Sequence, residues 1–111
     1  MTQPMQLVSW PDPTLDGPNR EVRSLAEADG LKLVSITLRH GTELPNHVAP
    51  GPITIQVVSG RVALLAAEEV HELAPGQVAL LPAGMHHTLR PIGDATVTVI
   101  LNRCSSPGVT S

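Results

Sequence analysis

The chain has 111 residues, which is enough for a single domain with one core and too few for two domains. The net charge is −3 and the seven Lys and Arg residues are scattered, so the chain lacks the basic patch of a nucleic-acid-binding protein. No apolar run is long enough to span a membrane. We therefore expect neither a nucleic acid nor a membrane as a partner.

Short runs rich in Val, Leu, Ile and Thr follow one another along the chain, separated by eleven prolines and nine glycines. This pattern predicts short β-strands joined by turns. After a Pro-rich arm, with at most one edge strand at 6–9, strands are predicted at residues 21–26, 31–39, 53–58, 61–67, 70–73, 78–81, 85–91 and 95–101. Residues 102–111 are small and polar, and we expect them to fray. The predicted units are an extended N-terminal arm (1–20), a β-barrel (21–103) and a flexible tail (104–111).

The segments between the strands have the residue types of tight turns and loops. Two-residue hairpin turns are predicted at Asp29-Gly30 and Ser59-Gly60, and further turns at Glu68-Glu69 and Gly93-Asp94. Residues 41–52 contain three prolines and two glycines, so we expect a loop without a helix there.

Side chains alternate between the two faces of each predicted strand. In the strand at 31–39, Val34, Ile36 and Leu38 form a buried face, whereas the opposite face carries Ser, Thr and Arg and should be at least partly exposed. The strand at 78–81 is apolar on both faces, and we expect it either to be buried on both sides or to form part of a barrel wall.

Two adjacent histidines follow the last Pro-Gly turn, and strand alternation sends them in opposite directions. Met85, His87 and Leu89 share one face, so His87 should point into the core. His86 lies beside Thr and Arg on the other face, and we expect it at the surface.

Eight or nine short strands without a helix favour a closed or double-sheet antiparallel barrel, in which sheet edges are removed or covered. The core must be aliphatic, because the chain has no Phe or Tyr and only one Trp, Trp10, which we expect to have a packing role. The predicted fold class is all-β, with a single antiparallel barrel.

Compartment and assembly follow from simple features of the sequence. The single Cys104 cannot form an internal disulfide, and the N-terminus has no basic stretch followed by an apolar block, so we expect a cytoplasmic protein. Residues 62–65 are apolar on both strand faces, which one small core cannot absorb entirely, and this predicts a homodimer.

Seven residues stand in two spaced groups, Gly41, His47 and Gly60 in the first and Gly76, Pro82, Gly84 and His87 in the second. Taken together, these groups resemble the two sequence motifs of the cupin superfamily. The resemblance covers residues 41–91 and implies a jelly-roll β-barrel of the RmlC-like cupin type. A homodimer is also consistent with this resemblance.

In cupins of the usual kind, three histidines and a carboxylate bind one divalent transition metal such as Fe, Mn, Ni, Cu or Zn. The resemblance implies His47 and His87 as metal ligands. The family's second histidine falls on Ala49, its glutamate on Ile53, and its later asparagine on Pro91. Because catalytic metal sites commonly need about three protein ligands, we expect a lower metal affinity in this chain.

Other side chains were weighed as further ligands. His40 continues the apolar parity of its strand and so has the parity of an inward residue. Gln56 lies on the strand of Ile53 with the opposite parity, so it would need a β-bulge to point inward. The sequence leaves open whether Gln56 or His40 completes the site. His71 adjoins glutamates and is expected to be a solvated residue at the rim.

Three functions remain open at this point. The first is a module that binds a small-molecule ligand in an apolar cavity, with a reduced or absent metal site. The second is a metal-dependent enzyme of the dioxygenase or isomerase type that uses His47 and His87, and the third is a structural barrel without a functional site. No catalytic residue is assigned. The predicted cavity-lining residues are Ile53, Ile55, Val57, Met85 and Leu89.

Overall fold

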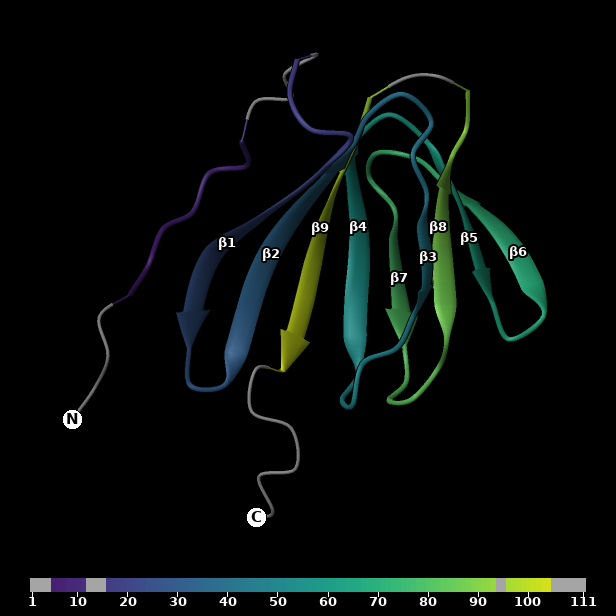
Figure 1. The fold of residues 1–111 in the computed structure, drawn as a ribbon. Coiled ribbons are helices and arrows are strands. Elements are labelled where there is room, and N and C mark those ends of the chain that lie inside the picture. The colour runs from purple at the N-terminus through teal and green to yellow at the C-terminus, as the bar shows by residue number, and fades with distance from the viewer. Residues whose placement is uncertain (1–4, 12–15, 94–95, 105–111) are drawn as a thin grey trace.

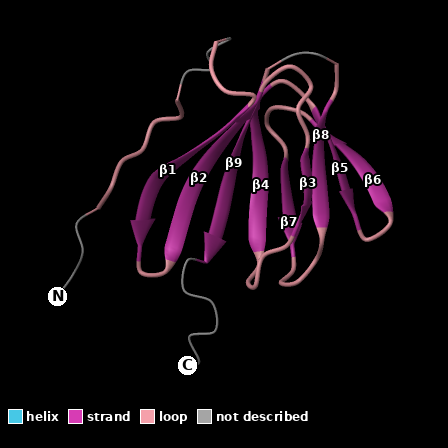
Figure 2. Cartoon of the chain, viewed as in Figure 1, coloured by secondary structure: helices cyan, strands magenta, loops and turns pink. Residues whose placement is uncertain are grey.

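The computed structural model describes residues 5–11, 16–93 and 96–104, which form nine strands and no helix (Figures 1 and 2). The strands are β1 (Arg20–Ala28), β2 (Leu31–Leu38), β3 (Leu44–His47), β4 (Ile53–Ser59), β5 (Val62–Ala66), β6 (Glu69–Leu73), β7 (Val78–Leu81), β8 (His87–Pro91) and β9 (Val97–Cys104). None of the described residues belongs to a helix with the length and apolar character of a membrane span.

The strands form two antiparallel sheets, as Figure 1 shows. The larger sheet has the order β1-β2-β9-β4-β7, and the smaller has the order β3-β8-β5-β6. Non-sequential neighbours such as β2 and β9, or β5 and β8, show that the chain crosses repeatedly between the sheets. This arrangement is a jelly roll, so the predicted all-β class and barrel are confirmed.

The core lies between the two sheets and is aliphatic, as predicted. Ile55 and Val57 of β4 and Val99 of β9 meet Leu64 of β5 and Leu89 of β8, and each of these side chains is buried. Removing one such side chain from water contributes about 1.5–3 kcal/mol to the stability of the fold. The alternation of apolar residues on β4 therefore identified its buried face correctly.

Two of the hairpin turns have the same backbone geometry. Asp29 and Gly30, between β1 and β2, have φ angles of 50° and 82°, which confirms the predicted two-residue turn. Ala67 and Glu68, between β5 and β6, have φ angles of 52° and 63°, so the turn lies one residue earlier than predicted at Glu68-Glu69. Neither Ala67 nor Glu68 is a glycine, so residue type did not indicate the exact position of this turn.

The predicted hairpin at Ser59-Gly60 is wrong. β4 pairs with β7 and β9, and β5 pairs with β6 and β8, so the two strands belong to different sheets. The connection therefore passes from one sheet to the other. Gly60 still has a positive φ of 81°, which favours glycine. The turn conformation therefore depends on the residue itself, whereas the pairing of the strands on either side depends on distant parts of the chain.

The structure of three segments also differs from the predictions. Residues 6–9 form no strand, although the side chain of Gln6 donates to the carbonyl oxygen of Glu27 at 3.2 Å. The predicted loop 41–52 contains β3, and β9 extends to Cys104, through residues expected to fray. In both cases a neighbouring strand, β8 or β2, supplies pairing that the segment's own composition does not indicate. Asp94 and residues 105–111 lie outside the described residues.

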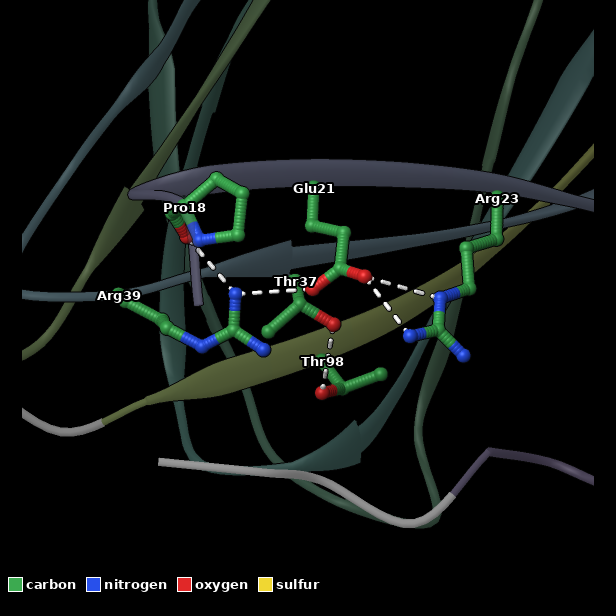
Figure 3. A network of polar contacts seen from close by, with 6 residues as sticks. All are labelled: Pro18, Glu21, Arg23, Thr37, Arg39 and Thr98. Atoms are coloured by element: carbon green, nitrogen blue, oxygen red, sulfur yellow. Dashed lines mark hydrogen bonds and ion pairs between the residues drawn. The ribbon is translucent and has the colours of Figure 1, made fainter. Parts of the chain in front are cut away.

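The polar face of β2 is buried, and the prediction of a partly exposed face is wrong. Thr37 is hydrogen-bonded to Thr98 of β9 at 3.3 Å, and Arg39, just after β2, is 2 % exposed (Figure 3). The Arg39 guanidinium donates to the carbonyl oxygen of Pro18 at 2.7 Å and forms an ion pair with Glu21 at 2.9 Å. These partners satisfy the charge and make its burial tolerable.

Glu21 lies between two guanidinium groups, as Figure 3 shows. Arg23 donates to its carboxylate from the same strand, and Arg39 approaches from the segment just after β2. Hydrogen bonds from Arg23 first, and then from Arg39, lower the pKa of the Glu21 carboxyl below its ordinary value of 4.5. This network holds the start of β1 against the end of β2.

β7 is the edge strand of the larger sheet, so it forms part of the barrel wall, and the alternative of burial on both faces is wrong. Leu81 is 3 % exposed, but Val78 and Leu80 on the other face are 61 % and 74 % exposed. Apolar residues on both faces therefore did not indicate burial on both sides. The homodimer expected from the sequence stays a prediction.

Candidate binding pocket

A pocket of about 440 Å³ opens on the inward face of the larger sheet at its β1 end. Every second residue of two neighbouring strands lines it, namely Arg20, Val22 and Ser24 of β1 and Lys32, Val34 and Ile36 of β2. β9, the start of β4 and the segment from β3 to Ala49 complete the wall, with His87 of β8. This volume falls in the range of about 300–1,000 Å³ that is common for small-molecule sites.

The deeper part of the pocket is apolar. Val34, Ile36, Leu44, Ile53 and Leu101 all line it and are buried in the core around it. No aromatic side chain other than histidine is present among the described lining residues. The pocket therefore suits a ligand with an aliphatic part rather than a flat ring that needs stacking.

His47 and His87 meet at one side of this pocket. They are register partners on β3 and β8, with ring centroids 6.3 Å apart and ring planes inclined by 38°. His87 is 4 % exposed, and its Nδ1 donates to the carbonyl oxygen of Met85 at 3.2 Å. That hydrogen bond leaves Nε2 of a neutral His87 as the ring nitrogen with a free lone pair.

His47 is more accessible than His87, but its electrostatic surroundings are unfavourable for a positive charge. Partial burial of its ring lowers its pKa below the ordinary value of 6.5, and the nearby His87 and Arg20 lower the pKa further. His47 is therefore neutral at pH 7 and can donate or accept a hydrogen bond there.

The lowered pKa of His47 predicts a pH-dependent stability. The unfolded chain binds a proton at His47 more readily than the folded protein, so the free energy of unfolding should decrease as pH falls from about 6.5 through the folded pKa. Above that range the group has no effect. Chemical denaturation between pH 7.5 and 5.5 avoids the contribution of Glu21, which acts below its ordinary value of 4.5. In His47→Gln the decrease should be smaller, and an unchanged decrease would contradict the assignment.

Comparison with known families and structures identifies the fold. The sequence profile described as the cupin domain matches residues 34–102, which is more than half of the chain. The chain belongs to the cupin family. None of the curated proteins compared with this cupin matches it in sequence.

Several solved structures share the fold at low sequence identity. An RmlC-like cupin family protein with a double-stranded β-helix fold from Methanocaldococcus jannaschii is 15 % identical, with 90 % of each chain covered and a TM-score of 0.72. An RmlC-like cupin protein from Desulfovibrio desulfuricans is 24 % identical over 83 % of this chain and 88 % of that one, with a TM-score of 0.69. A conserved protein of unknown function from Streptococcus pyogenes is 24 % identical over 80 % and 76 % of the two chains, with a TM-score of 0.67.

The residues around His47 and His87 do not fit a complete cupin metal centre. Among the described residues, no three or more His, Cys, Asp or Glu side chains are grouped so that they could hold one ion. Ala49 and Ile53, which take the places of a histidine and a glutamate in the family motif, both line the pocket. The wall of the pocket is thus apolar where the usual cupin has metal ligands, and a dication would lack compensating charge there.

The side chains weighed as additional ligands lie elsewhere. His40 is exposed in the turn after β2 with φ of 56°, and Gln56 is half-buried on β4 but does not line the pocket. His71 is exposed and contacts Glu69 at 2.8 Å. None of these residues lines the pocket of His47 and His87.

The two adjacent histidines point in opposite directions, as strand alternation predicts. His87 is buried, whereas His86 is exposed and its Nδ1 lies 3.1 Å from Oδ1 of Asn46. Asn46 precedes His47 on β3, so His86 contacts the same strand from the outer side of the barrel. His86 therefore lies outside the pocket.

The structure places the predicted cavity-lining residues in three different surroundings. Ile53 lines the pocket. Ile55, Val57 and Leu89 are 2 % exposed or less and belong to the filled core, while Met85 borders a separate groove between β6 and β7. Alternation along a strand indicates which side chains point inward, but it does not show where the interior is filled and where it remains open.

Four polar residues of the pocket were not identified from the sequence. Arg20 and Ser24 lie on β1, Lys32 on β2 and Arg103 on β9. The inward direction of Lys32 could have been predicted, because Lys32 has the same parity as Val34 and Ile36 on their strand. Arg103 lies in a segment that was expected to fray, so its inward direction could not be anticipated.

Proposed function

We propose that this cupin binds a small organic molecule in the pocket beside His47 and His87 and needs no resident metal to do so. The observation that carries the proposal is the replacement of two family ligand positions by Ala49 and Ile53, both on the wall of an open pocket. A change of this kind exchanges metal-binding groups for apolar contact area, which favours binding of an organic ligand.

The two histidines supply the polar contacts in this proposal. A neutral His47 presents one donor and one acceptor at the accessible side of the pocket. His87 is fixed by its hydrogen bond to Met85, which leaves its Nε2 as the ring nitrogen for a ligand. A ligand with a hydroxyl or amide group can therefore be oriented by the histidines while its aliphatic part contacts Ile53 and Leu44.

The two other functions receive less support from the structure. A metal-dependent enzyme would have to hold its ion with two imidazoles, without a third ligand among the described residues. A purely structural barrel would be expected to fill its interior, yet a pocket of about 440 Å³ remains beside the histidines. Small-molecule binding uses both the pocket and the histidines.

Ser24→Phe is expected to abolish ligand binding by filling the mouth of the pocket. Ser24 is an exposed residue of β1 that lines the pocket, so the larger ring enters it without replacing a core side chain. Ligand-observed NMR with a mixture of small acids, amines, amides, alcohols and sugars should detect binding to the unaltered protein. The same ligands should give no signal with Ser24→Phe, and a chelator such as EDTA should leave their binding unchanged.

Val70→Phe is the matched control for this experiment. Val70 is 66 % exposed on β6 and does not line this pocket, so the substitution adds the same ring to another strand without blocking the site. Retention of binding by Ser24→Phe would place the ligand elsewhere and refute the proposal. Loss of binding with EDTA would favour the metal-dependent enzyme.

A further inference from the structure

The cations of the pocket differ from those on the rest of the protein. Of the seven Lys and Arg residues, four form ion pairs with glutamates, namely Arg23, Arg39, Arg61 and Arg90. The other three are Arg20, Lys32 and Arg103, and all of them line the pocket. These three form no ion pair with any described residue, and no described Asp or Glu lines the pocket. In a protein of net charge −3, the three Lys and Arg residues that form no ion pair with described residues therefore lie at one pocket.

Two of these cations are directly opposite each other. The register of β2 and β9 pairs Lys32 with Arg103, and like charges at such positions repel each other. Glu27 of β1 is the register partner of Lys32 on its other side, but it forms no ion pair with Lys32 and does not line the pocket. An anion placed between Lys32 and Arg103 would relieve the repulsion.

An apolar pair adjoins the two cations on the same face. Val34 and Leu101 are register partners, two residues further along β2 and β9, and both line the pocket with exposures of 5 % and 9 %. A ligand that enters past the cations therefore meets an aliphatic wall directly behind them. From its opening inward, the pocket thus has first a positively charged rim and then an apolar interior.

We propose that the pocket binds an aliphatic carboxylate, with the carboxylate between Lys32 and Arg103 and the hydrocarbon chain on Val34 and Leu101. The proposal rests on the proposed function, since it names the class of ligand for the same pocket. A guanidinium matches the two oxygens of a carboxylate with parallel hydrogen bonds, and an ammonium adds a point charge. Arg20, on the β1 side of the pocket, adds to the positive field that attracts the ligand.

The test compares acids with their neutral amides. Hexanoate, octanoate and decanoate, the corresponding amides, and hexyl phosphate are titrated into the full chain by calorimetry at low salt, where charge effects are least screened. Each carboxylate should bind at least about tenfold more tightly than its amide. Lys32→Gln and Arg103→Gln should each weaken carboxylate binding by about tenfold and leave amide binding nearly unchanged.

Arg61→Gln is the matched control, because it removes one positive charge from an exposed ion pair with Glu72 of β6, on the other sheet. Carboxylate affinity should remain within about twofold in this variant, since Arg61 does not line the pocket and its exposed charge acts on the ligand only weakly through water of high dielectric constant. Circular dichroism verifies that all variants are folded.

Three results would overturn the assignment of a carboxylate. If acids and amides bind with equal affinity and Ser24→Phe abolishes the binding of both, the carboxylate is not what the pocket recognises, and the proposed function still holds. Tighter binding of hexyl phosphate would show that the cations recognise a phosphate. If none of these compounds binds, the aliphatic carboxylate is wrong, and the proposed function is then decided by the broader ligand mixture.

Discussion

Leu81→Ala should lower the free energy of unfolding by about 2–5 kcal/mol, whereas Leu80→Ala should change it by no more than about 0.5 kcal/mol. The two leucines are adjacent on β7, but Leu81 is 3 % exposed and packs in the core, while Leu80 is 74 % exposed. Truncating Leu81 removes its buried contacts and leaves a cavity. Truncating Leu80 removes a side chain that is already in contact with water.

Urea denaturation followed by circular dichroism measures both changes, and each variant is the control for the other because the substitution and the strand are the same. Similar losses of stability in the two variants would contradict the edge position of β7. If Leu80 is covered by a second copy of the chain, its substitution would also destabilise the protein, and that loss would increase with protein concentration.

Gly60→Ala should lower the free energy of unfolding by about 2–4 kcal/mol, and Gly76→Ala by about 1–2 kcal/mol. Both glycines have positive φ, 81° and 93°, so both substitutions carry the strain of a left-handed backbone. A Cβ at Gly60 would also lie 2.8 Å from Cγ2 of Val97 and 3.0 Å from the carbonyl oxygen of Thr96. No described atom lies within 4 Å of a Cβ at Gly76.

The difference between the two variants isolates the steric contact, because the backbone strain is common to both. Thermal unfolding provides the measurement. Val97 begins β9, so the contact with Gly60 fixes the connection between the sheets against the central strand of the larger sheet. A smaller loss for Gly60→Ala than for Gly76→Ala would show that this contact is not tight.

Features that depend on neighbouring residues in the sequence were predictable. The opposite directions of His86 and His87 follow from strand alternation, and the turn at Asp29-Gly30 follows from residue type. The motifs that end at Gly60 and His87 resemble those of cupins, and the match over residues 34–102 confirms the family. Each of these features depends on residue types at fixed spacing along the chain, and it needs no knowledge of which strands pair.

Features that depend on strand pairing were not predictable. Residues 44–47 form a strand because β8 pairs with them, and Leu80 is exposed because β7 has no neighbour beyond it. The turn at Ser59-Gly60 joins two sheets instead of closing a hairpin. Which strands pair depends on contacts between residues far apart in the chain, and local composition contains little of that information.

The sequence by itself determined the all-β class, the aliphatic core, the family, and the inward direction of His87. Only the tertiary structure decided where the barrel is filled and where it is open, because an inward side chain leaves a cavity only if its partners across the barrel are small or distant. It also decided that Arg20, Lys32 and Arg103, from three different strands, line one pocket. The charge of a pocket is a property of strand register, and no single segment of the sequence contains it.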